Sequence, residues 1–134
     1  MEKELLFEGI ENTTSVNVKE FSPAGARLDI TISGKISGKL TGQILSTHFI
    51  LLKAGGVSEI DLKSVIFSNG EPVFVSGKAT GKIVDPAPIG KIQGDLTFQT
   101  PSQRLAYLNT TKGWTDALYN LATGEYTFKV YAVK

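Results

Sequence analysis

Short segments that alternate apolar and polar residues, separated by frequent turn signals, dominate this sequence. Residues 26–33 (ARLDITIS) place Leu28, Ile30 and Ile32 on one face, and residues 125–133 (EYTFKVYAV) repeat the pattern. Successive side chains of a strand point to opposite faces, so a period of two predicts β-strands. Turn residues recur at 22–25, 54–56, 68–72, 85–88 and 122–124. Several short strands at this spacing predict an all-β antiparallel sandwich or barrel.

The spacing of the glycines favours the barrel. Gly34, Gly38 and Gly42 lie four residues apart, as do Gly77 and Gly81. Glycines at this spacing share one face of a strand and allow a strongly bent strand to turn a barrel corner. The chain has 134 residues, which suits one domain. We therefore expect a single antiparallel β-barrel domain over residues 1–134, with at least seven strands.

Residues 100–108 (TPSQRLAYL) interrupt the alternation. A proline after a threonine suits the first position of a helix that has a threonine N-cap. Leu105 and Leu108 then fall three residues apart, on one helical face. We expect one short helical turn near 101–108 that closes one end of the barrel and turns Leu105, Tyr107 and Leu108 toward the lumen.

The composition excludes several classes of partner and cofactor. The formal net charge is +1 and the lysines are spread along the chain, so no strong field favours nucleic acid or an anionic membrane. There is no cysteine and His48 is the only histidine, which removes the common zinc ligand sets. The segment GKISGKL lacks the glycine spacing and the hydroxyl residue of a phosphate-binding loop. We expect no cofactor, no metal, no nucleic acid and no membrane association.

The N-terminal segment MEKELLFEGI has too short an apolar run for a signal peptide. No apolar stretch approaches the ~20 residues that a membrane helix needs. These two features predict a cytoplasmic location.

The segment GVSEIDLKSVIF places charged and apolar residues on opposite faces of a strand. Glu59, Asp61 and Lys63 share one face. The other face carries Ile60, Leu62 and Ile66. Periodicity leaves open which face points into the barrel. With the charges in solvent, the aliphatic face is core. With the charges in the lumen, they could supply a general acid or base, and the aliphatic face would be covered by the second subunit of a homodimer.

Two further features have a structural and a functional interpretation. His48 stands before the apolar run FILL, and we expect it in a hydrogen bond at a strand end rather than in catalysis. Aromatic residues gather in the C-terminal third, among them Tyr107 and Trp114. They could pack in the core or line a pocket for an apolar or aromatic ligand.

Four blocks in a fixed order resemble the bacterial family called domain of unknown function 3237. They are SGKISGKLTGQIL, GVSEIDLKSVIFSNGEPVFVSGKATG, LTFQTPSQRLAYLN and YTFKVYAVK. The resemblance covers residues 25–134, and the sequence departs from the family pattern at Tyr107, where the family has tryptophan, and at Lys63, where it has arginine. It implies a small calycin-like antiparallel barrel from a family with no settled biochemical activity. It also implies that Glu59, Asp61, Lys63 and Asn109 form the polar part of a lumen site.

Together these observations predict an uncharacterised small β-barrel protein that binds a small apolar or aromatic molecule in its lumen. The predicted binding residues are Glu59, Asp61, Lys63, Tyr107, Asn109 and Trp114. Two alternatives stay open. A cofactor-free isomerase or cyclase would use Asp61 or Glu59 as base and Asn109 as a donor to an oxyanion or carbonyl. A structural or assembly protein would instead have a filled core.

Overall fold

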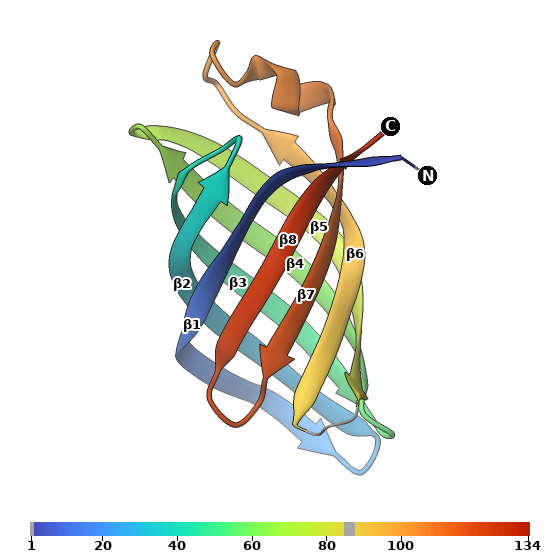
Figure 1. Ribbon diagram of the computed structural model, residues 1–134. Coiled ribbons are helices and arrows are strands. Elements are labelled where there is room, and N and C mark those ends of the chain that lie inside the picture. Colours follow the sequence, from blue (N-terminus) through green and yellow to red (C-terminus); the bar gives the residue numbers. More distant parts are fainter. Residues whose placement is uncertain (1, 85–87) are drawn as a thin grey trace.

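Eight antiparallel strands close into one barrel (Figure 1). The computed structural model describes residues 2–84 and 88–134. The strands are β1 (Lys3–Ser22), β2 (Gly25–Gly38), β3 (Gly42–Lys53), β4 (Val57–Ser68), β5 (Glu71–Val84), β6 (Ile89–Gln99), β7 (Lys112–Asn120) and β8 (Glu125–Val133). Each strand pairs with its neighbours in the chain, and β8 pairs with β1 to close the wall. The predicted single antiparallel barrel is confirmed.

Tight turns join the strands where the sequence marks them. Asn69 and Gly70 have φ values of 51° and 79°, the two positive values that a type I′ hairpin turn requires. This turn leads directly from β4 into β5, where Pro72 is the second residue. The turn expected at 85–88 falls largely on residues 85–87, which lie outside the described residues.

Glycines allow the strands to approach closely where the wall bends. A Cβ atom on Gly34 of β2 would overlap the backbone oxygen of Ile10 on β1, and one on Gly94 of β6 would overlap the backbone oxygen of Lys78 on β5. A larger residue at either position would push neighbouring strands apart. The glycines therefore act as expected, by permitting the curvature that closes the barrel.

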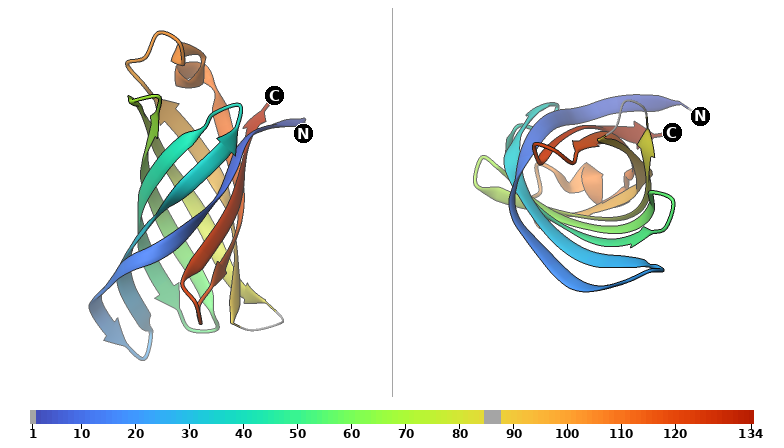
Figure 2. Two further views of the ribbon diagram at one scale, coloured as in Figure 1. Left: turned by 60° about the vertical axis from the view of Figure 1, so that its left-hand side comes forward. Right: turned by 90° about the horizontal axis from the view of Figure 1, so that it is seen from below.

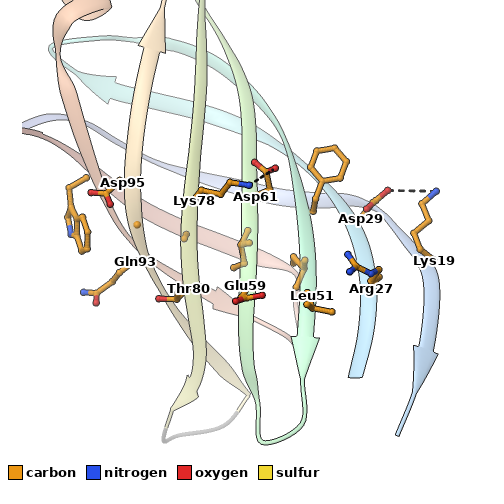
Figure 3. Close-up of a pocket in the computed structure, with 16 residues that line it drawn as sticks. Lys19, Arg27, Asp29, Leu51, Glu59, Asp61, Lys78, Thr80, Gln93 and Asp95 are labelled. Atoms are coloured by element: carbon orange, nitrogen blue, oxygen red, sulfur yellow. Dashed lines mark hydrogen bonds and ion pairs between the residues drawn. The ribbon is translucent and has the colours of Figure 1, made fainter. Parts of the chain in front are cut away.

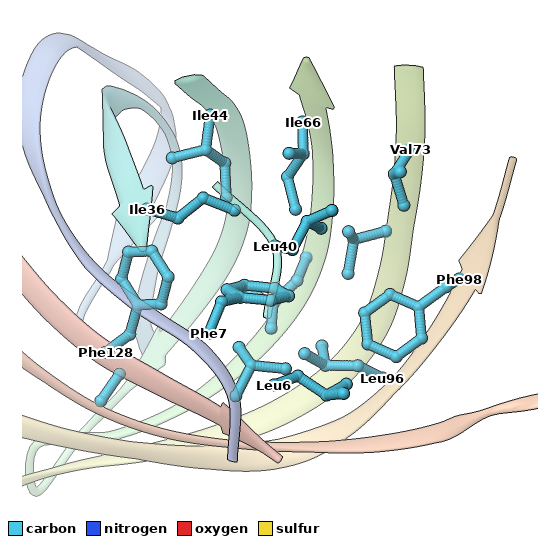
Figure 4. Close-up of a cluster of buried hydrophobic side chains, with 14 of the residues drawn as sticks. Leu6, Phe7, Ile36, Leu40, Ile44, Ile66, Val73, Leu96, Phe98 and Phe128 are labelled. Atoms are coloured by element: carbon cyan, nitrogen blue, oxygen red, sulfur yellow. The ribbon is translucent and has the colours of Figure 1, made fainter. Parts of the chain in front are cut away.

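Apolar side chains fill most of the interior. The end of the barrel nearest the C-terminal helical turn holds a dense layer of them, shown in Figure 4. Its members include Leu6, Phe7, Ile36, Leu40, Ile44, Ile66, Val73, Leu96, Phe98 and Phe128. Ile60 and Leu62 of β4 also point inward and are buried. The aliphatic face of β4 is therefore core, and the interpretation of that face as a homodimer interface is wrong.

A short 3₁₀ helix, η1 (Ala106–Thr110), lies at one end of the barrel (Figures 1 and 2). It begins later than the expected turn near 101–108. Leu105 and Leu108 are buried at that end as expected, but Tyr107 is 48% exposed. A 3₁₀ helix has three residues per turn, so residues 105 and 108 share one side and residue 107 points away from it. The expectation that Tyr107 faces the lumen is therefore wrong.

Candidate functional site

The predicted binding residues on the strands lie on the outer wall of the barrel. Glu59, Asp61 and Lys63 occupy the outer face of β4, because the aliphatic side chains of that strand take the inner face. Trp114 likewise faces outward from β7, between the buried residues Gly113 and Thr115. Placing these four residues in the lumen is therefore wrong.

Ion pairs tie the charged face of β4 to the neighbouring strands. The Asp61 carboxylate lies 3.1 Å from the Lys78 ammonium group and 3.6 Å from that of Lys63. Glu59 pairs with Lys53 at 3.2 Å. Most of these side chains are about half exposed or more, although Asp61 Oδ1 is buried and accepts no hydrogen bond from the described residues. Ion pairs between exposed side chains contribute little free energy. The charged face therefore has the character of a solvated surface.

Asn109 has a structural role at the end of the barrel. Its Oδ1 accepts a hydrogen bond from the backbone N–H of Thr100 at 2.7 Å, and its Nδ2 donates to the backbone oxygen of Thr100 at 3.1 Å. Both halves of the amide are used to hold the segment between β6 and η1. Asn109 and Tyr107 therefore do not line the lumen. Ligand binding by the six predicted residues stays a prediction.

A furrow of about 790 Å³ crosses the outer wall, and its lining includes Glu59, Asp61 and Trp114 (Figure 3). Its lining comes from seven consecutive strands, from Lys19 on β1 to Trp114 on β7. At a strand spacing of about 4.8 Å this is roughly 29 Å along the wall. A small molecule could touch only part of such a furrow and would stay largely in water, whereas ligand pockets bury most of the ligand. The furrow is therefore a surface rather than an enclosing site.

The lumen holds a cluster of polar side chains, most of them buried, and only His48 among them is a candidate residue from the sequence. Its members are Glu11, Ser46, His48, Ser64, Thr115 and Tyr126, and Glu11 is only 1% exposed. They surround a cavity of about 30 Å³ together with apolar side chains such as Phe7, Leu62 and Phe128. These residues come from β1, β3, β4, β7 and β8, so the closed barrel is what assembles them.

Glu11 is the centre of this cluster. Its Oε1 accepts a hydrogen bond from the Ser46 hydroxyl at 3.1 Å, and the Ser64 hydroxyl donates to Ser46 at 2.7 Å. Its Oε2 is buried without a hydrogen-bond partner among the described residues. Burial raises the pKa of Glu11 to about 8, because the carboxylate loses its hydration, and the bond from Ser46 offsets this only in part. At neutral pH the group is therefore mainly protonated and uncharged.

His48 and Tyr126 form the aromatic side of the cluster. Their ring centroids are 5.0 Å apart in an edge-to-face arrangement, and Tyr126 stacks on Phe128 at 5.4 Å. Burial lowers the pKa of His48 to about 4 and raises the pKa of Tyr126, to which the charge of Glu11 adds a smaller rise. His48 lies in the middle of β3, so the expectation of a strand-end position is wrong. At neutral pH the cluster thus offers uncharged hydrogen-bonding groups inside an apolar wall.

The sequence around Glu11 does not predict that its side chain points into the barrel. An irregularity between Leu5 and Phe7 shifts the register of β1 against β8. After it Phe7 and Glu11 are buried in the barrel, while Ile10 is 51% exposed. Hydrophobic alternation would turn Ile10 inward and Glu11 outward. Phe7 and Glu11 lie four residues apart and share one face, whereas Leu6 and Ile10 share the other. Both faces carry apolar residues, so the residue pattern alone does not decide that Glu11 points inward.

Two further properties of the described ranges bear on the predicted partners. No group of three or more histidine, cysteine, aspartate or glutamate side chains there could hold a metal ion. No helix in the same ranges is long and apolar enough to cross a membrane. A cytoplasmic location stays a prediction.

Comparison with known proteins places the fold. No protein-family model and no curated protein matches the sequence. A β-barrel-like protein from Acinetobacter baumannii AYE is 22% identical, with a TM-score of 0.85 over 99% of this chain and 96% of that one. A protein with unknown function from Clostridium acetobutylicum ATCC 824 is 19% identical, with a TM-score of 0.86 over 100% of both chains. An enzyme from Penicillium herquei is 19% identical, with a TM-score of 0.76 over 99% of this chain and 94% of that one.

At these identities the likeness establishes the fold alone. The chain is a small β-barrel protein similar to barrels whose functions are uncharacterised. Membership of the family called domain of unknown function 3237, and the calycin-like relationship that it implies, stay predictions.

Proposed function

We propose that this barrel binds a small, largely apolar or aromatic molecule in its lumen, with the Glu11 carboxyl group as the hydrogen-bonding anchor. The observation that carries the proposal is the buried Glu11 Oε2, which has no partner among the described residues and adjoins a cavity of about 30 Å³. An unsatisfied buried polar group costs roughly 1–3 kcal/mol of stability. A buried polar group lowers stability relative to an apolar residue of the same size. Such groups are typical of binding and catalytic sites.

The cluster favours an uncharged ligand. Protonated Glu11 can donate a hydrogen bond to a carbonyl or hydroxyl oxygen, and neutral His48 supplies no counter-charge. A charged ligand would lose its hydration on entering the lumen and would find no ion partner there, which costs free energy. Phe7, Leu62 and Phe128 offer apolar contact beside the anchor. Small neutral ketones, enones and phenols therefore fit the chemistry of the site.

The cavity has room for the polar group of such a ligand and not for the whole molecule. A volume of about 30 Å³ suits a group of about the size of one water molecule. The rest of the ligand would need side chains beside the cavity, Tyr126 among them, to turn aside. Entry would be from the end opposite η1, where Leu28, Ile50 and Tyr119 are only partly buried. Leu108 and its neighbours close the other end.

A second function, cofactor-free isomerisation, is favoured by the pKa of about 8 for Glu11. A group that titrates close to the working pH can both take and return a proton. The Glu11 carboxylate would take a proton from the carbon beside the ligand carbonyl and return it to another carbon of the same molecule. No oxidant or reductant is consumed. Asp61 and Glu59, expected in this role, lie on the outer wall, so Glu11 replaces them.

A thermal-unfolding screen with small neutral ketones, enones and phenols tests the proposal. Glu11→Leu removes the anchor, and Glu59→Leu on the outer wall is the matched control. We expect a compound that stabilises the native protein and Glu59→Leu but has lost its effect on Glu11→Leu. No stabilising compound, or one that stabilises Glu11→Leu equally, would contradict a lumen site at Glu11. Conversion of a bound compound that stops in Glu11→Gln would establish the isomerase.

A further inference from the structure

Part of the first strand has an open edge. β8 pairs with β1 only from Lys3 to Asn12, whereas β1 continues along β2 to Ser22. Residues 14–22 therefore have a strand neighbour on one side only, within the ranges that the structure describes. Figure 2 shows the tip of the β1–β2 hairpin swinging away from the mouth of the barrel. We call residues 14–22 the β1 edge.

The β1 edge carries unusually exposed apolar side chains. Val16, Val18 and Phe21 are 53%, 59% and 80% exposed, more than any other large apolar side chain among the described residues. An unpaired strand edge offers free backbone donors and acceptors to another strand, and exposed apolar side chains favour that pairing. The two features coincide on these nine residues.

The charges of the β1 edge are balanced within its own hairpin. Lys19 lies 3.7 Å from the Asp29 carboxylate, and Glu20 lies 3.2 Å from the Arg27 side chain. The edge therefore presents no surplus charge that would select a strongly acidic or basic partner. A β-strand with apolar residues and balanced charge fits it best.

We propose that the β1 edge binds the same edge of a second copy of this chain, which gives a homodimer with antiparallel strands across a two-fold axis. The segment is self-complementary in one register. With Asn17 opposite Asn17 of the second copy, Val16 faces Val18. This regular stretch is bounded by irregularities of β1 between Thr13 and Ser15 and between Val18 and Glu20. The two valines then contact each other, Phe21 lies outside the paired stretch, and no like charges face each other. The homodimer expected from the sequence would use this edge instead of β4.

Cross-linking tests the register directly, because the chain contains no cysteine. Directly opposed residues of an antiparallel pair have Cα atoms about 4.5–5.5 Å apart, which suits a disulfide. We expect Asn17→Cys to form a disulfide-linked dimer in high yield under mild oxidation. The matched variant Leu45→Cys should stay monomeric, because Leu45 is 48% exposed but lies on β3 between two paired strands.

Sedimentation across micromolar concentrations tests the interface in the native chain. We expect a dimer whose dissociation constant rises about tenfold or more in Val18→Lys, because a lysine on the edge disfavours strand pairing. Leu45→Lys should leave the dissociation constant unchanged, and both variants should keep the native circular dichroism spectrum. A native monomer, a dimer that survives Val18→Lys, or no cross-link in Asn17→Cys would each overturn the proposal. Attachment of monomers to lipid vesicles or to another protein through the β1 edge would overturn it as well.

Discussion

Replacing Glu11 by glutamine keeps the shape of the side chain and its bond from Ser46 but removes the ionisable group. In the folded protein the pKa of Glu11 is about 8, whereas an unburied glutamate has a value of 4.5. The folded state therefore holds the proton more tightly than the unfolded state does. The stability from this group is fully present below pH 4.5 and is lost as the pH rises to about 8. The rise from 4.5 to about 8 corresponds to roughly 5 kcal/mol.

His48 titrates in the opposite sense. Burial lowers its pKa from 6.5 to about 4, so the unfolded state binds the proton more tightly. Its contribution is present above pH 6.5 and is lost as the pH falls to about 4. Between pH 4.5 and 6.5 the two groups change the free energy of unfolding in opposite directions as the pH rises. Above pH 6.5 only Glu11 still lowers it. Since His48 is present in both proteins, its effect cancels in the comparison with Glu11→Gln.

Urea unfolding of the native protein and of Glu11→Gln between pH 5 and 9 measures this difference. We expect the free energy of unfolding of Glu11→Gln to gain about 1.4 kcal/mol over the native protein for each pH unit up to pH 8, then to level off. Glu59→Gln on the outer wall is the control and should show no such trend. A Glu11→Gln difference that stays constant from pH 5 to 8 would refute the buried, protonated carboxyl group.

Three other substitutions test the structural assignments by urea unfolding. Asn109→Ala should lower the free energy of unfolding by about 1–3 kcal/mol, because two backbone groups of Thr100 lose their partners; an unchanged midpoint would contradict the structural role. Leu108→Ala should cost about 2–5 kcal/mol, since it opens a cavity beneath η1, and a cost below that range would mean that Leu108 does not close the barrel end. Asp61→Asn should change the free energy by less than ~1 kcal/mol, and a larger loss would mean that the ion pairs of β4 are not solvated.

The barrel was predictable because its strands bury one face each. Residues 26–33 and 125–133 alternate cleanly, and Asn69-Gly70 identifies a hairpin turn from its conformational preference alone. The sequence does not determine the orientation of β4, since its charged and aliphatic residues alternate and either face could point inward. In the structure the aliphatic face of β4 points inward. Burying the charged face instead would cost free energy, because its charges would leave water.

The candidate site could not be predicted in the same way. Glu11 faces inward after the register of β1 against β8 shifts between Leu5 and Phe7. The residue pattern does not predict where such a register shift occurs. The partners Ser46 and His48 come from β3 and become neighbours of Glu11 only when the barrel closes. Tyr107 lies two residues after Leu105 and one before Leu108, so neither an α-helix nor a 3₁₀ helix places all three side chains on one side.

Methyl and carboxyl NMR of the native protein with a stabilising neutral compound tests the lumen site most directly. Leu62 and Ile44 report on the inner wall beside the cavity, and Leu45 reports on the outer wall of the same strand as Ile44. Binding in the lumen should shift the methyl signals of Leu62 and Ile44 and the carboxyl carbon of Glu11, while the signal of Leu45 stays in place. Shifts confined to Leu45 and other outer-wall residues, or no compound that moves the inner methyl groups, would contradict a ligand site in the barrel.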